Sequence, residues 1–265
     1  MSHTYKALQV LRLYDEQHQL LRAADIAQSL QISKATAYRC IEDLECAGLL
    51  ACVGGGLYSL GPAIIEMDRR IRATDPLVEA ASDVARTLSE ATHSAIVLCR
   101  PYGLKVICIH SVACQATPAA SGYERGRTMS LYRGAPSCAI FAHLPARTLR
   151  RIIDEDAGEL GEAGWPTRRS DLQQRLQALR LQRVQRSLDG ADARAHSWAV
   201  PLFLRQRLMG SLSVVRESAG LPAEEQARIG ARLEQSALRV EANLEAIVCN
   251  RRCLARAGAS TIAND

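Results

Sequence analysis

The chain has 265 residues, of which 48% are hydrophobic and 23% are charged, and its formal net charge is +5. This balance is typical of a soluble globular protein and excludes a largely disordered chain. No stretch reaches the roughly 18 consecutive apolar residues of a membrane span, and charged residues interrupt the start before a signal peptide could form. We therefore expect a cytoplasmic protein of two domains with no membrane partner.

The positive charge is unevenly distributed. Residues 1–62 contain five basic and six acidic side chains and so carry one net negative charge. The basic excess lies further along, in "MDRRIRA" and "TRRSDLQQRLQALRLQRVQR". The net charge alone is therefore weak support for nucleic-acid binding.

The nine cysteines are scattered singly, with no CxxC pair. Metal sites usually show closely spaced ligand pairs, and disulfide scaffolds are usually short and secreted. We interpret the cysteines as small buried hydrophobic residues and expect no metal and no cofactor. A redox-active or metal-sensing thiol is the alternative.

The chain begins with segments of helical spacing. Residues 4–17 predict a first helix, residues 20–21 a short extended piece, and residues 23–30 a second helix. The apolar positions that define the two helices are Tyr5, Leu8, Leu11, Ile26, Ala27 and Leu30.

A third helix and a hairpin follow. Ser33 is a favourable N-cap, and Gly48 ends the helix as a C-terminal cap. Its inward face consists of Ala37, Cys40, Ile41 and Leu44. Next, "LLACVGGGLYSLGP" places two apolar runs around three glycines, which predicts a hairpin with a flexible tip. This order of elements is that of a winged helix-turn-helix.

The outward face of the third helix has the composition of a DNA-reading surface. Small, hydroxylated and basic residues gather in its first turns, where a recognition helix contacts base edges: Lys34, Ala35, Thr36, Tyr38 and Arg39. The acidic residues Glu42, Asp43 and Glu45 come later, where the helix would leave the groove. The alternative is a solvated face that binds a protein partner.

The remaining residues predict an α+β domain around an antiparallel sheet. Residues 63–75 read as a helical linker, and the final helix has apolar positions at Ile229, Leu233, Leu238, Leu244 and Val248. Between them we expect helices at 77–91, within 135–155 and at 169–183, and strands at 94–100, 104–112, 128–132, 197–204 and 207–215. The expected domains are 1–62 (winged helix), 63–75 (linker), 76–250 (α+β domain) and 251–265 (flexible tail).

Several short motifs carry a family resemblance: "KALQVL", "DIA", "ATAYRCI" and "YSLGP" in the winged helix, and "RGRTMSLYRGAPSCAIFAHLP", "SWAVPLF" and "LMGSLSVV" in the second region. With these motifs the sequence resembles the IclR-type bacterial transcriptional regulators. The resemblance extends from Tyr5 to about Val248, and it is more specific in the N-terminal region.

The resemblance implies a sequence-specific DNA-binding regulator with a GAF-like effector-binding domain. A small organic ligand, an acid or an aromatic catabolite, would alter binding to a palindromic operator, and the protein would be a homodimer or a dimer of dimers. We expect DNA contacts from Arg22, Ser33, Lys34, Ala35, Thr36, Tyr38, Arg39, Gly54, Gly55 and Gly56.

The resemblance also places the effector site. Its small-residue turn and strand positions correspond to Ala135, Pro136, Ser137, Cys138, Ser197, Ser213 and Val215, with Asp189 in place of an acidic run. Here "YRGAPSC" stands where the family usually has "HATALGK", and Val215 replaces a serine. Arg133 is an addition that suits an anionic ligand.

Two alternatives remain from the residues themselves. One is a thiol-triggered DNA-binding regulator, because Cys138 at a helix start could have a lowered pKa. The other is an enzyme that uses Cys138 as a nucleophile with His143, His110 or His196 as the base. We expect no enzymatic activity, because no paired carboxylates and no phosphate-binding loop accompany these residues.

Overall fold

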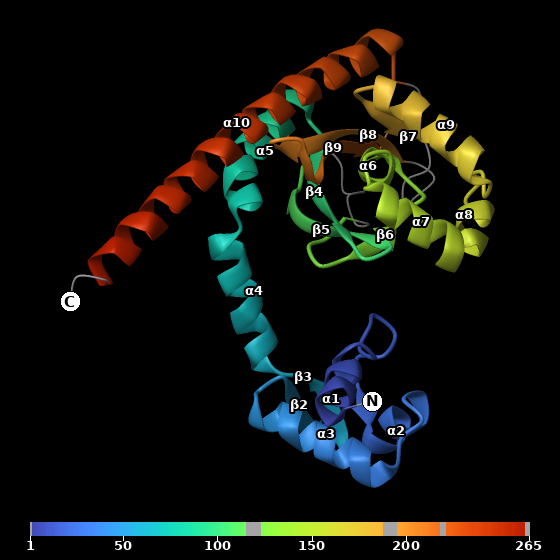
Figure 1. The fold of residues 1–265 in the computed structure, drawn as a ribbon, viewed down its shortest axis with the longest axis vertical. Helices are drawn as coiled ribbons and strands as arrows, with labels where there is room; N and C mark the ends of the chain where they lie inside the picture. Colours follow the sequence, from blue (N-terminus) through green and yellow to red (C-terminus); the bar gives the residue numbers. More distant parts are fainter. Residues whose placement is uncertain (1, 115–122, 188–194, 218–220, 263–265) are drawn as a thin grey trace. The chain divides into compact units, whose positions relative to one another are not determined.

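The computed structural model describes residues 2–114, 123–187, 195–217 and 221–262, and it divides into two compact units, Met1–Asp75 and Pro76–Asp265 (Figure 1). No helix within the described ranges is long and apolar enough to cross a membrane.

The first unit is a winged helix-turn-helix, as the sequence predicts. Its elements are α1 (His3–Leu11), β1 (Leu21–Arg22), α2 (Ala23–Ser29), α3 (Lys34–Cys46), β2 (Leu50–Gly54), β3 (Leu57–Leu60) and α4 (Pro62–Thr74). The three strands form an antiparallel sheet in the order β1-β3-β2. Its core includes the four predicted α3 positions, Ala37, Cys40, Ile41 and Leu44, which are all buried.

The predicted length of α1 was wrong, and its apolar positions Tyr5 and Leu8 are not the buried ones. The helix ends at Leu11, because the Asp15 carboxylate accepts the backbone N–H groups of Gln17 and His18, at 2.8 and 2.7 Å, and so favours a turn. Its buried residues are the small Ala7 and Val10, whereas Tyr5 and Leu8 are exposed. The smaller side chains allow α1 to pack closely against its neighbours.

Two glycines lie where the end of α3 and the start of α4 come close together. Gly48 has a φ of +68°, and its N–H donates to the carbonyl of Glu45 while the N–H of Leu49 donates to that of Leu44. These two bonds form a Schellman cap of α3. A Cβ on Gly61 would lie 2.3 Å from the Gly48 carbonyl oxygen, so only glycine fits where α4 begins.

The second unit is built on a six-stranded antiparallel sheet in the order β6-β5-β4-β9-β8-β7. Its elements are α5 (Pro76–Thr92), β4 (Ala95–Tyr102), β5 (Lys105–Val112), β6 (Thr128–Ser130), α6 (Ala135–Phe141), α7 (Ala146–Glu155), α8 (Ala157–Glu162), α9 (Arg169–Leu181), β7 (Gln185–Ser187), β8 (Ala195–Leu204), β9 (Arg207–Glu217) and α10 (Ala223–Ile262). The short α8 and β7 were not predicted, and α10 runs through most of the expected tail.

Helices cover both faces of this sheet (Figure 1). Alternate strand residues point to opposite faces, so Trp198 and Val214 pack with α5 and α10, while Val97 and Cys99 pack with the α6–α9 side. On α10 the apolar position Leu238 does not belong to the inward stripe, because that side chain is half exposed. The inward stripe runs through Leu233, Ala237, Val240 and Leu244, at helical spacing.

Candidate functional site

The first candidate surface is the N-terminal half of α3. Lys34, Ala35, Tyr38 and Arg39 are exposed, and 56% of the Tyr38 surface is accessible. They lie opposite the buried stripe of the same helix. The exposed face of α3 therefore presents two cations, one phenol and one methyl group together. The opposite face of the same helix is packed in the core.

The start of α3 is fixed by its own side chains. Ser33 Oγ accepts the Thr36 N–H at 3.2 Å, and the two hydroxyl groups are also hydrogen-bonded to each other at 2.8 Å. Ser33 is therefore the predicted N-cap. Thr36 is half-buried and its hydroxyl group is engaged in this cap, so its role in the structure is local.

Two of the three acidic residues in the second half of α3 have structural partners. Asp43 is paired with His3 of α1, with 2.7 Å between Nε2 and Oδ2, and Glu45 accepts the N–H of Cys52 in β2 at 3.1 Å. These contacts connect α3 to α1 and to the hairpin. The negative charges lie away from the basic first turns.

The tip of the hairpin presents backbone and no basic side chain. Gly54, Gly55 and Gly56 have φ angles of +99°, +60° and +70°, and nothing within 4 Å surrounds the place of an added Cβ. Glycines in such open surroundings allow phosphate oxygens to approach the backbone closely. Arg22, an exposed residue of β1, is paired with Leu57 and so places a cation beside the hairpin.

In the second unit, the predicted effector positions meet where α6 packs on the sheet. The N–H of Ala135 lies 3.4 Å from Ser197 Oγ of β8, and Ser211 Oγ of β9 donates to the carbonyl of Pro136 at 3.0 Å. Ala135, Pro136, Ser137 and Ser197 are buried in this contact. The structure thus brings these residues together, mainly as a close helix–sheet junction.

The other predicted effector residues lie in different surroundings. Ser213 is paired with Ala199 and Val97 on the adjoining strands, and its buried hydroxyl group has no hydrogen-bond partner among the described residues. Val215 is part of the apolar core. Arg133 is exposed and donates to the carbonyl of Glu162 at the end of α8. Asp189 lies outside the described residues.

The expected lowering of the Cys138 pKa was wrong. Burial raises the pKa of this thiol to about 11, which outweighs the effect of the nearby Arg175. Burial and Arg180 lower the pKa of His143, which favours its neutral form. A thiol held protonated is a poor nucleophile and a poor redox sensor. Within the described ranges no three His, Cys, Asp or Glu residues are grouped as metal ligands.

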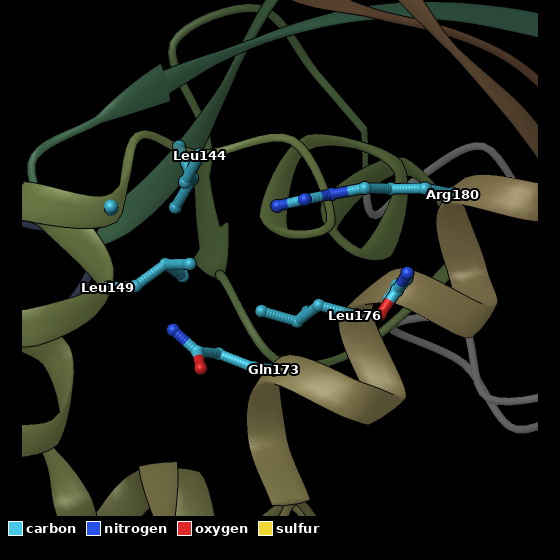
Figure 2. Close-up of a pocket in the computed structure, with 7 residues that line it drawn as sticks. Leu144, Leu149, Gln173, Leu176 and Arg180 are labelled. Atoms are coloured by element: carbon cyan, nitrogen blue, oxygen red, sulfur yellow. The ribbon is translucent and has the colours of Figure 1, made fainter. Parts of the chain in front are cut away.

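A further cleft, which was not predicted, lies between α7 and α9. Its volume is about 440 Å³, and it is lined by Leu144, Ala146, Leu149, Gln173, Leu176, Gln177 and Arg180. Figure 2 shows Leu149 facing Leu176 and Gln173, with Arg180 extending from α9 across the cleft. The α9 residues share one face of the predicted helix, but their partner helix could not be identified from local sequence.

Comparisons with known proteins agree with this architecture. The model of the bacterial transcriptional regulator IclR C-terminal domain matches residues 72–242, and that of the IclR helix-turn-helix domain matches residues 5–52. Both describe parts of a regulator and neither describes a catalytic domain. A search of curated proteins found no match.

Solved structures share the fold at low sequence identity. An IclR-type transcriptional regulator from Silicibacter sp. TM1040 is 21% identical, with a TM-score of 0.77 over 92% of this chain and 96% of its own. An IclR family regulator from Brucella abortus is 21% identical, with a TM-score of 0.76 over 91% and 92%. An IclR homologue from Microbacterium hydrocarbonoxydans, crystallised with 4-hydroxybenzoate, is 16% identical, with a TM-score of 0.75 over 92% and 100%.

Proposed function

Because the chain belongs to the IclR family of bacterial transcriptional regulators, we propose that it binds a specific operator and that a small organic ligand in the second unit alters this binding. Such a regulator would act in the bacterial cytoplasm, where the chromosome lies.

The exposed first half of α3 carries the DNA-binding part of this proposal. Lys34 and Arg39 have the charge for phosphates or guanine edges, and Tyr38 stands between them with an exposed ring. Ala35 leaves room for the backbone to approach the bases. Arg22 and the amides at Gly54, Gly55 and Gly56 would add phosphate contacts, and Ser33 would hold the helix start.

The ligand-binding part rests on the junction of α6 with β8 and β9. A buried hydroxyl group without a partner is unfavourable, and a ligand atom at Ser213 would satisfy it. The Microbacterium relative binds 4-hydroxybenzoate, which supports an organic acid or aromatic compound as the ligand class. We infer that Ala135, Pro136, Ser137 and Ser197 would form the wall of this site, with Cys138, Val215, Arg133 and Asp189 as less direct candidates.

A single winged helix offers limited contact with DNA, so we infer that two or four copies act together. Two copies related by twofold symmetry would read the two halves of a palindrome, with half-sites spaced by about one helical turn.

The decisive experiment is binding of the full-length protein to the DNA upstream of its own and neighbouring genes, across a salt series. We expect a footprinted palindrome and an affinity that falls steeply as salt rises, because bound cations displace counterions from phosphates. Small acids and aromatic compounds, 4-hydroxybenzoate included, can then be screened for changes in operator affinity. Equally weak binding to every sequence, at all salt concentrations, would contradict the operator-binding assignment.

A further inference from the structure

The cleft between α7 and α9 has the chemistry of an anion site. Its apolar wall consists of Leu144, Leu149 and Leu176, which are buried members of the core below it. Gln173, Gln177 and Arg180 supply the polar groups from successive turns of α9. The lining thus contains one cation, two amides and no carboxylate.

The Arg180 side chain is held in place through its Nε, and the structure describes no acidic partner for its terminal nitrogens. Its Nε donates to the carbonyl of Ala142 at 2.5 Å, where α6 ends. Helix C-termini leave carbonyl groups without intrahelical partners and carry partial negative charge, so this contact fixes the guanidinium group. No acidic side chain within the described residues forms an ion pair with Arg180, and its two terminal nitrogens can receive a carboxylate end-on.

From these observations we propose that the cleft binds a small organic monocarboxylate with an apolar body, such as a short alkyl or single-ring acid. Its carboxylate pairs with the terminal nitrogens of Arg180, and its body lies on the three leucines. Gln173 and Gln177 donate to the second lone pairs of the same two carboxylate oxygens. The site shares no residue with the effector positions near Ser213, so it is a second ligand site beyond the proposed function.

The test uses methyl-labelled, full-length protein and follows the Leu144, Leu149 and Leu176 methyl resonances during titration. The probes are benzoate and hexanoate, with benzamide as the uncharged counterpart of benzoate. We expect both acids to shift these methyl signals at millimolar concentration and benzamide to bind about tenfold more weakly, because it lacks the charge-assisted pair.

Two pairs of variants separate the cleft from its surroundings. Arg180→Gln removes the cation, and Gln177→Glu adds a carboxylate at an exposed position that can compete for it. Each should weaken benzoate binding about tenfold. Arg183→Gln and Gln174→Glu make the same changes at exposed positions outside the cleft and should leave binding within about twofold.

Four outcomes would overturn the proposal: no shift of the three leucine signals with either acid, equal binding of benzamide, unaltered binding in Arg180→Gln, or unaltered binding in Gln177→Glu. Ser213→Ala should leave the cleft titration unchanged. If operator binding fails but the cleft titration behaves as expected, only the proposed function is contradicted, and the reverse result contradicts only the cleft.

Discussion

The starts of α3 and α6 both contain small residues, and these residues have opposite roles in the structure. From the sequence alone, small residues at a helix start are interpreted as room for a partner. Ala35 of α3 faces solvent, so its small size leaves space for another molecule. Ala135 and Ala139 of α6 face Ala199 of the sheet, so their small size lets the helix pack closely. A small residue at a helix start therefore indicates that another group can pack closely against the helix. Only the fold shows whether that group is a binding partner or another part of the same chain.

The largest expected effect is the loss of stability when the aromatic packing of α6 is removed. Phe141 is fully buried, with its ring centroid 4.9 Å from that of Trp165 and 5.3 Å from that of Tyr132. Phe141→Ala should destabilise the second unit by about 3–5 kcal/mol, because it leaves a cavity in this cluster. Both tryptophans, Trp165 and Trp198, lie in this unit, so denaturant unfolding followed by tryptophan fluorescence reports on it directly.

Leu181→Ala is the matched control for Phe141→Ala, because 85% of the Leu181 surface is exposed. It should change the unfolding free energy by less than about 0.5 kcal/mol. A loss below about 1 kcal/mol in Phe141→Ala would mean that α6 does not depend on this packing.

The second effect tests the outward face of α3. Arg39→Ala should weaken operator binding by about 1–3 kcal/mol and leave the thermal midpoint unchanged, because the side chain is exposed. Tyr38→Ala should relax sequence preference more than it lowers non-specific affinity. Electrophoretic mobility shifts with operator and scrambled DNA measure both, and Arg12→Ala serves as an exposed arginine outside α3. Wild-type affinity in both α3 variants would remove the groove-helix assignment.

The third effect compares two serines under α6. Ser211→Ala leaves the Pro136 carbonyl without its hydroxyl donor and should destabilise the second unit by about 1–2 kcal/mol. Ser213→Ala removes a hydroxyl group that has no partner among the described residues, so stability should be unchanged or slightly higher. Chemical denaturation of the two variants measures this difference. Equal losses would show that Ser213 also has a structural bond, which would weaken its assignment to a ligand.

The smallest effect concerns the first unit at high pH. Burial, with a smaller contribution from Tyr58, raises the pKa of Tyr14 to about 12, and its hydroxyl group donates to the Tyr58 carbonyl at 3.1 Å. The folded pKa of Tyr14 lies above the unfolded value of about 10. The contribution of the neutral Tyr14 side chain to the stability of the first unit is therefore complete below about pH 10 and is lost as the pH rises toward 12.

Tyr14→Phe should therefore destabilise the first unit by about 1 kcal/mol at neutral pH and reduce its loss of stability between about pH 10 and 12. Circular dichroism melts of wild type and variant across this range provide the measurement. The same alkaline slope in both proteins would assign the loss to other groups.

Local signals in the sequence were sufficient to predict helix features that depend only on residues nearby in the chain. Ser33 caps α3 by accepting the N–H of Thr36, three residues further along the chain, and the buried stripe of α3 follows from its apolar spacing. Both predictions are confirmed. The Ala135 N–H at the start of α6 meets Ser197, which is 62 residues away in the chain. That contact exists only after β8 has joined the sheet, and no local pattern contains it.

Other features depended on competition between neighbouring groups. The end of α1 was missed because the Asp15 turn outweighs the apolar spacing beyond it. The raised pKa of Cys138 was missed because burial, which comes from the whole helical layer, outweighs its place near a helix start. The α7–α9 cleft likewise needs two helices whose pairing only the tertiary structure provides.

The arrangement of α3 has a consequence for how this protein can acquire a new target sequence. Its outward residues Lys34, Tyr38 and Arg39 make no hydrogen bond or ion pair with the rest of the described first unit, whereas Asp43 and Glu45 connect it to α1 and β2. Substitutions at these three exposed positions are therefore nearly free of a folding penalty, while the capping residues, the buried stripe and the last turns are constrained. Under the proposed DNA-binding role of α3, mutational drift would rewrite which bases are read without rebuilding the scaffold, and a designer would exchange the same few positions for that purpose.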